Sequence, residues 1–96
     1  MIAKIHEIEY RTILAVCDKE HIGKEFEDGK IFFKASEKFY NGKKITKKEL
    51  EELLQQADSI NLFGNKCVEI ALQKQLISEK NIILIKGIKH AQIYRV

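Results

Sequence analysis

The sequence predicts a small α/β (α+β) domain: a mixed sheet with an N-terminal β-hairpin, two main helices and a C-terminal βαβ unit. Two apolar segments close together near the start indicate the hairpin, and a capping-box pattern at 46–49 indicates a surface helix. A strand–helix–strand pattern over residues 59–86 indicates the βαβ unit. With 96 residues, of which 45% are hydrophobic, the chain suits one domain spanning 1–96.

The first two strands are expected at 2–9 and 12–17. Residues 2–9 mix apolar and charged side chains on both faces, which is typical of an edge strand. The segment TILAVC at 12–17 is the stronger strand, because it is almost entirely apolar and β-branched. Tyr10 and Arg11 would form the turn of an antiparallel hairpin, although they lack the Asn-Gly pair that marks the strongest hairpin turns.

Short elements are expected between the hairpin and the first main helix. Asp18 is a suitable N-cap for one helical turn that ends at Gly23, where a left-handed residue commonly terminates a helix. An Asp28-Gly29 turn then introduces a strand at 31–36 (IFFKAS), whose aromatic and β-branched residues favour extended structure. A second short helical turn follows at 36–40.

The first main helix is expected at 47–57. Thr46 and Glu49 form the capping box, in which hydroxyl and carboxylate each accept a backbone N–H at the helix start. The apolar residues of this segment fall on one helical face, which indicates a surface helix docked on the sheet. These residues are Leu50, Leu53, Leu54 and Ala57.

The C-terminal third is expected to contain the βαβ unit and a final strand. Its first strand is SINLF at 59–63, its helix lies at 66–75, and its second strand is NIILIK at 81–86. Adjacent isoleucine and leucine residues in 81–86 predict burial on both faces, as in an inner parallel strand. The last strand, at 91–96, is separated from 81–86 by Gly87.

The candidate binding site lies where the two parallel strands of the βαβ unit end. Strands joined by such a crossover point the same way, so their carboxyl ends meet at one edge of the sheet, where ligands of open α/β sheets bind. The N–H groups that open the 66–75 helix would favour an anion such as phosphate. Gly64 and Asn65 would equally suit an ordinary strand-to-helix turn. The candidate nucleic-acid or anion-binding residues are Asn61, Gly64, Asn65, Lys66, Lys86, Gly87, Lys89, His90, Gln92 and Arg95.

The charge balance is mildly basic, with 17 Lys and Arg against 14 Asp and Glu and a formal net charge of +3. A nucleic-acid function therefore depends on local clustering. Lysines gather at 43–48, at 34–38 beside Phe39 and Tyr40, and in the tail from Lys86 to Arg95. Lysines can neutralise phosphates, and aromatic rings can stack on unpaired bases. The alternative is that the aromatic residues are core and the lysines are a solvated surface.

His90 is the residue most open to a chemical role, because a neutral imidazole can act as base, ligand or hydrogen-bond partner. A structural histidine is the alternative, since no sequence spacing supplies a catalytic partner. Cys67 is expected in the first turn of a helix, where the dipole and Lys66 could lower its thiol pKa, although a buried small hydrophobe is the default interpretation. The histidines and the two cysteines are scattered rather than closely paired, so we expect no metal and no cofactor.

Three features of the sequence bear on where the protein is located. No apolar run approaches the about 20 residues that cross a bilayer, and the first ten residues alternate apolar and charged side chains instead of forming a signal-peptide core. Cys17 and Cys67 are most simply reduced thiols in a cytosol. We therefore expect a cytoplasmic protein without membrane contact.

A family resemblance rests on four segments: AVCDKEHIGKEF at 15–26, FYNGKKIT at 39–46, NLFGNKCVEIAL at 61–72 and IKGIKHAQIYRV at 85–96. Together they resemble the archaeal family of uncharacterised proteins known as domain of unknown function 424. The family commonly has a proline before the histidine, where this chain has Lys89. The resemblance implies an archaeal cytoplasmic α/β protein, sometimes described as RNA-binding or placed near translation, with no established activity.

Three classes of function follow from these observations. The leading hypothesis is a noncatalytic protein that binds RNA or belongs to a ribonucleoprotein or translation complex. The second is a protein-interaction module, either an adaptor or a homo-oligomer formed through an edge strand. The third is a small-molecule or nucleotide-dependent enzyme centred on His90.

Overall fold

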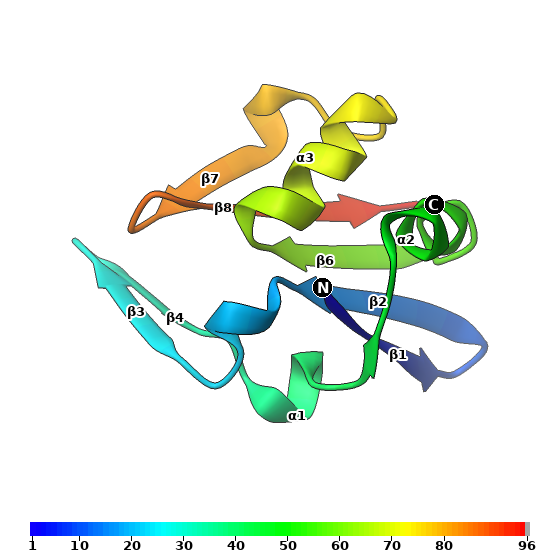
Figure 1. Ribbon diagram of the computed structural model, residues 1–96, viewed down its shortest axis with the longest axis horizontal. Coiled ribbons are helices and arrows are strands. Elements are labelled where there is room, and N and C mark those ends of the chain that lie inside the picture. The colour runs from blue at the N-terminus through cyan, green and yellow to red at the C-terminus, as the bar shows by residue number, and fades with distance from the viewer. Residues whose placement is uncertain (96) are drawn as a thin grey trace.

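A computed structural model describes residues 1–95 (Figure 1). Val96, the last residue of the strand expected at 91–96, lies outside the described residues. The strands and helices are β1 (Ile2–Ile8), β2 (Arg11–Cys17), β3 (Glu25–Asp28), β4 (Ile31–Lys34), α1 (Glu37–Tyr40), β5 (Lys43–Lys44), α2 (Lys47–Leu54), β6 (Ser59–Phe63), α3 (Asn65–Gln73), β7 (Ile82–Ile85) and β8 (Ile88–Tyr94). Two 3₁₀ turns lie at Lys19–His21 and Glu79–Asn81.

The main sheet has the order β5-β1-β2-β6-β8-β7, and β3 with β4 forms a separate hairpin. Neighbouring strands are antiparallel except for β2 and β6, which pair in parallel with Leu14 opposite Ile60. The expected class, a small mixed α+β fold with an N-terminal hairpin, is confirmed. No helix within residues 1–95 is long and apolar enough to cross a membrane.

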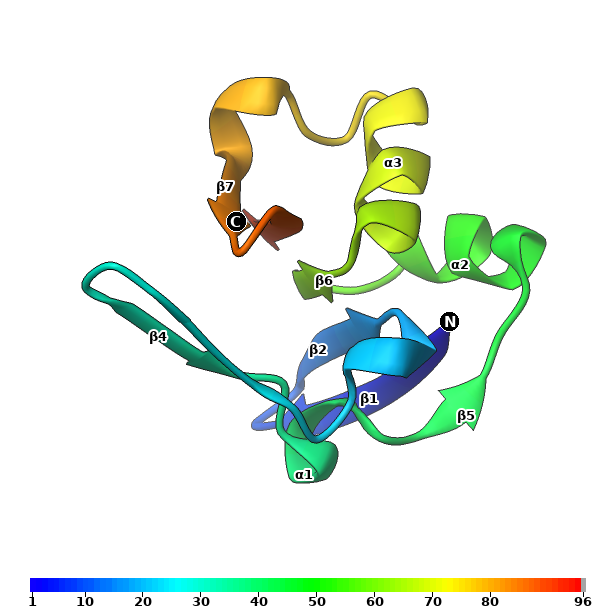
Figure 2. The same ribbon diagram turned by 60° about the vertical axis from the view of Figure 1, so that its left-hand side comes forward.

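Both faces of the sheet are partly covered. Figure 2 shows α2 and α3 on one side and the β3–β4 hairpin projecting on the other. Because side chains alternate along a strand, Leu14 and Val16 of β2 join the core under the helices, whereas Ala15 and Cys17 join the core under the hairpin. The helix-side core also contains Leu50, Leu54, Ile60, Leu62, Val68 and Ala71. The hairpin-side core also contains Ala35, Tyr40, Phe63 and Ile85.

The N-terminal hairpin turns one residue earlier than expected. Ile8 pairs with Arg11, so the two turn residues are Glu9 and Tyr10, and both adopt positive φ angles of 47° and 71°. Positive φ at both central residues matches the twist of a two-residue hairpin turn. The register therefore fixes the turn even though neither residue is glycine or asparagine.

The expectation that 81–86 is an inner parallel strand is wrong. β7 lies at the edge of the sheet, and its Ile83 and Leu84 side chains are 50% and 57% exposed. A two-residue turn at Lys86 and Gly87 sends the chain straight back, so β8 inserts between β6 and β7. β6 and β7 still run in the same direction, as expected, because each is antiparallel to β8. The inner parallel pair is instead β2 with β6.

Two strands were not expected. β3 is mostly charged (EFED), and β5 contains only two lysines, so neither carries the apolar pattern that indicates a strand. Pairing with β4 and β1 respectively stabilises them. The two main helices occur where expected, with α2 ending at Leu54 and α3 beginning at Asn65.

Candidate nucleic-acid interface

The expected phosphate site at the start of α3 is already occupied by a side chain of this chain. The carboxylate of Asp18 accepts the backbone N–H of Lys66 at 2.9 Å and that of Cys67 at 3.2 Å. Asp18 is only 4% exposed. The expectation that these N–H groups bind an external anion is therefore wrong, because a buried carboxylate already satisfies them.

Gly64 makes room for this contact. Its φ is 134°, and a Cβ built there would lie 2.3 Å from the Asp18 Cγ atom, far closer than atoms can approach. Gly64 is thus required by both its backbone conformation and its neighbour. Asp18 was expected to cap the 3₁₀ turn Lys19–His21, but its side chain makes no cap bond there. No local pattern signals its real partner, because α3 begins almost fifty residues further along the chain.

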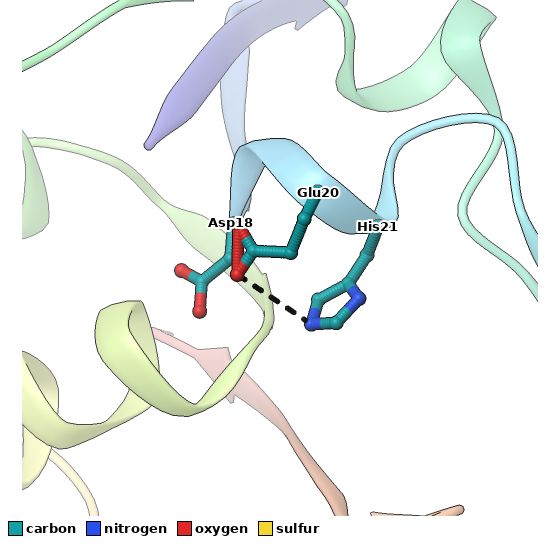
Figure 3. Close-up of side chains that lie close together, drawn as sticks. All are labelled: Asp18, Glu20 and His21. Atoms are coloured by element: carbon teal, nitrogen blue, oxygen red, sulfur yellow. Dashed lines mark ion pairs between the residues drawn. The ribbon is translucent and has the colours of Figure 1, made fainter.

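Asp18 also lies near two other polar side chains of the same turn. Figure 3 shows its carboxylate directed at the start of α3, with Glu20 and His21 beside it. One ligand atom from each of the three residues lies within 4.8 Å of the others. Glu20 forms an ion pair of 3.9 Å with His21. Asp18 thus caps α3, whereas Glu20 and the half-buried His21 form a pair that is ionic when His21 is protonated.

The start of α2 is also capped internally. Thr46 Oγ1 accepts the Glu49 N–H at 3.1 Å, and Glu49 Oε1 accepts the Thr46 N–H at 3.0 Å, which confirms the expected capping box. These bonds lower the pKa of the Glu49 carboxyl. Because the N–H groups of Glu49, Lys66 and Cys67 are already paired within the chain, a surface that binds an anion beside these two helix starts would draw mainly on side chains.

Lysine side chains supply such a surface. A groove of about 660 Å³, which we call the lysine groove, lies between the β5–α2 segment and the first turns of α3. Lys44 comes from β5, Lys47 from the first turn of α2 and Lys66 from the first turn of α3. The remaining lining residues are Met1, Ile45, Thr46, Asn65, Glu69, Ile70 and Gln73. The fold thereby brings two lysine-bearing segments that are separate in sequence to one place.

The groove contains a single acidic residue, Glu69, among its lining residues. The Glu69 carboxylate lies 3.7 Å from the Nζ atom of Lys89, which lies outside the groove. Lys89 is held beside the start of α3 by a second contact, because its backbone N–H donates to Asn65 Oδ1 at 2.9 Å. Lys89 therefore offsets the charge of Glu69, and the three groove lysines remain without an acidic partner among the described residues.

Three further candidate residues lie away from the groove. Lys86 and Gly87 form the β7–β8 turn, where the Lys86 N–H donates to Asp28 Oδ2 at 2.9 Å. The Arg95 guanidinium donates to the carbonyls of Ala57, at 3.0 Å, and Leu54. Arg95 thus satisfies carbonyl groups at the C-terminal end of α2, a common role for a cation at that position.

The last three candidates lie on the hairpin side of the sheet. Asn61 of β6 is opposite Gln92 of β8, and Gln92 Nε2 donates to Asn61 Oδ1 at 2.8 Å. His90 is only 8% exposed and packs against the rings of Phe33 and Phe63. Burial lowers the pKa of His90, which keeps the imidazole neutral near pH 7. The ten candidate residues are therefore divided between two faces of the sheet.

Both cysteines are buried free thiols. Burial raises the pKa of Cys17 to about 12 and also raises the pKa of Cys67, and the negative charge of Asp18 acts in the same direction. The helix dipole cannot activate Cys67 because Asp18 already occupies that helix start. The interpretation of Cys67 as a buried small hydrophobe is confirmed.

The fold and the groove define a small mixed-sheet α+β protein with a basic groove between its two helix starts. The chain belongs to the family described as "Protein of unknown function (DUF424)", whose model matches residues 6–96. It is also similar to an uncharacterized conserved protein from Methanopyrus kandleri, known from a crystal structure. The similarity has a TM-score of 0.81 and 26% identity, and it covers 99% of this chain and 90% of that chain. No curated protein matches the sequence.

Proposed function

We propose that this chain is a noncatalytic RNA-binding protein that holds the phosphate backbone in the lysine groove. The observation that carries the proposal is the convergence of Lys44, Lys47 and Lys66, from three separate elements, on one groove, with no acidic partner for any of them within residues 1–95. Lysine ammonium groups bind phosphates as point charges without reading sequence. The groove therefore suits a polyanion backbone.

The positions of two of these lysines are unfavourable for the fold itself. Lys47 and Lys66 lie in the first turns of α2 and α3, where the helix dipole favours acidic residues and disfavours cations. The carboxylates of Asp18 and Glu49 offset that cost, because each accepts a backbone N–H group at the start of one of these helices. A bound phosphate provides a reason for cations at both positions, because it supplies the negative charge that the helix starts favour.

Several narrower features belong to the same proposal. The family resemblance implies an archaeal, cytoplasmic protein near translation, and a ribonucleoprotein complex would supply the RNA. The hairpin-side residues Asn61 and Gln92 are not needed for backbone binding. Lys89 belongs to the interface only indirectly, through its contact with Glu69.

Fluorescence anisotropy with labelled single-stranded RNA tests the proposal. The variant Lys44→Gln/Lys47→Gln/Lys66→Gln removes the groove lysines. Three lost phosphate contacts should weaken binding about 50-fold at about 0.15 M salt, the counterion-release contribution of three contacts. Matched DNA and tRNA titrations test whether the polyanion is RNA.

A matched control variant has the same net charge as the groove variant. Lys24, Lys30 and Lys80 are exposed lysines outside the groove, and Lys24→Gln/Lys30→Gln/Lys80→Gln removes the same charge. This control should bind nearly as tightly as the unaltered chain. Equal losses in the two triple variants would mean that only overall charge matters, and the groove would then have no specific role.

A second candidate function, a homo-oligomer formed through an edge strand, is favoured by β7. This strand is at the edge of the sheet, and Ile83 and Leu84 are exposed on its two faces. Exposed apolar edges tend to pair with another strand. Sedimentation equilibrium of the chain and of Leu84→Lys distinguishes the cases, because a β7-mediated dimer dissociates in the variant and a monomer is unaffected.

A further inference from the structure

A second groove lies on the opposite side of the sheet from α2 and α3. It measures about 230 Å³ and is lined by Asn81, Ile83, His90, Gln92 and Tyr94, and we call it the β8 groove. His90, Gln92 and Tyr94 alternate along β8, so their side chains share one face of the sheet. Ile83 lies on the neighbouring strand β7, where it pairs with His90, and it completes the lining of the groove.

The carboxamide of Gln92 is fixed by neighbours at both of its polar atoms. Its Nε2 donates to Asn61 Oδ1 at 2.8 Å, and its Oε1 accepts from the Tyr94 hydroxyl at 3.3 Å. A carboxamide has two N–H donors on its nitrogen and two lone pairs on its oxygen. Each of these bonds therefore uses one of the two hydrogen-bonding positions of its atom. One donor and one acceptor of Gln92 remain, side by side. This pair matches the hydrogen-bonding edge of a nucleobase.

The walls of the groove suit a flat, largely apolar ring. The Tyr94 side chain is 68% exposed and Ile83 is 50% exposed, so an aromatic ring and an aliphatic side chain are both accessible. The volume is below the about 300 to 1,000 Å³ that is typical of pockets for whole small molecules. A single ring system with a polar edge therefore fits better than an extended ligand.

His90, which also lines the β8 groove, has a buried polar atom without a partner among the described residues. It is only 8% exposed, yet its Nε2 has no hydrogen-bond partner within residues 1–95. Buried polar atoms without partners are rare and need an explanation. His90 lines the groove, but its Nε2 is buried, so the groups that face a ligand in the groove are those of Gln92, Tyr94 and Ile83.

We propose that the β8 groove holds one unpaired base of a bound single-stranded RNA, stacked on Tyr94 and hydrogen-bonded to Gln92. This inference rests on the proposed function, since the lysine groove supplies the backbone affinity. Lys89 connects the two surfaces: its ammonium contacts Glu69 of the lysine groove, and its chain neighbour His90 lines the β8 groove. The chain therefore distinguishes single strands, whose bases are accessible, from duplexes, whose bases are paired.

The test compares single-stranded and duplex RNA by fluorescence anisotropy for four proteins: the unaltered chain, Tyr94→Ala, Tyr94→Phe and Tyr10→Ala. Tyr10 is the matched control, because it is fully exposed at the β1–β2 turn and does not line the groove. Tyr94→Ala should weaken single-strand binding at least about fivefold, the lower end of base–aromatic stacking, and leave duplex binding unchanged. Tyr10→Ala should bind both ligands as the unaltered chain does. Tyr94→Phe keeps the ring but loses the hydroxyl that holds Gln92, so it should lose some single-strand affinity, but less than Tyr94→Ala loses.

A nucleoside titration separates this inference from the proposed function. Adenosine carries no phosphate, so its effect on the side-chain amide NMR signals of Gln92 and Asn61 does not depend on the lysine groove. If the chain binds no RNA, the proposed function fails, and adenosine-induced shifts of these signals would still support a base site. Unchanged signals, or single-strand binding by Tyr94→Ala equal to that of the unaltered chain, would overturn the β8 groove. Adenosine binding as tight as that of the RNA would assign the groove to free nucleosides and overturn its role in strand binding.

Discussion

Replacing Gly64 by alanine should be among the most damaging single changes to this fold. Its backbone, with φ at 134° and ψ at 144°, is in a region that residues with a Cβ adopt only under strain of about 1 to 3 kcal/mol. The new Cβ would lie 2.3 Å from Asp18 Cγ and 2.4 Å from Oδ2. Asp18 must therefore move, and losing even one charge-assisted hydrogen bond to the start of α3 costs about 1.5 to 3 kcal/mol.

Together these terms predict a loss of about 2.5 to 6 kcal/mol in the free energy of unfolding, measured by urea denaturation with far-UV circular dichroism. Gly29→Ala is the matched control, because Gly29 also has a positive φ of 62° but has nothing within 4 Å of a built Cβ. It should lose only about 1 to 2 kcal/mol. In the Asp18→Ala background, Gly64→Ala should cost less than in the unaltered chain, because the two closest contacts, with Cγ and Oδ2, are gone and only the Cβ contact at 2.7 Å remains. Equal losses at Gly64 and Gly29 would refute this account of Asp18.

Three further predictions concern titration, thiol reactivity and helix charges. Burial holds the pKa of His90 in the folded chain below its ordinary value of 6.5. As the pH falls below about 6.5, the imidazole therefore binds a proton in the unfolded chain before it does so in the folded chain. Stability should then fall between about pH 7 and the lowered pKa, and urea titrations of His90→Leu should show a smaller decrease; an identical slope would contradict this cause. Cys17 and Cys67 should resist iodoacetamide until the chain unfolds, because both are buried with raised pKa values, and rapid labelling of the native protein, followed by mass spectrometry, would disprove it. Lys47→Gln and Lys66→Gln should each raise stability by about 0.3 to 1 kcal/mol at low salt, since each removes a cation from a helix start, and thermal unfolding showing a lower midpoint would count against this reasoning.

Features set by neighbouring residues could be predicted from the sequence. The Thr46–Glu49 capping box needs only residues three apart, and it forms as expected. The apolar face of α2 is equally local, because its residues recur at helical spacing. The direction of β7 relative to β6 also follows from local rules, through the crossover that joins them.

Features set by distant residues could not be predicted. The partner of Asp18 depends on the parallel pairing of β2 with β6, which places the end of β2 beside the start of α3. The strand order likewise depends on the tight turn at Lys86 and Gly87, which leaves the apolar strand β7 at an edge. An apolar run in the sequence indicates a strand but does not say which of its faces a neighbour covers.

The candidate site also combines features that neighbouring residues set with features that only the fold sets. Lysine clustering at 43–48 and the Asn65-Lys66 pair were each visible in the sequence, but only the fold brings them to one groove. Arg95 had the right charge for a phosphate contact and instead satisfies carbonyl groups of α2. Tyr94 was not recognised, because nothing in a six-residue strand pattern shows that its ring stays exposed beside Gln92.

The salt dependence of RNA binding tests the central claim most directly. Three phosphate contacts on a single strand give a slope of about −2 in log K against log salt, which is about a 20-fold loss between about 50 and about 200 mM. We predict that Lys44→Gln/Lys47→Gln/Lys66→Gln reduces the magnitude of that slope by about 2, whereas Lys24→Gln/Lys30→Gln/Lys80→Gln leaves it unchanged. The same slope in both triple variants would contradict a role for the lysine groove in holding the RNA backbone.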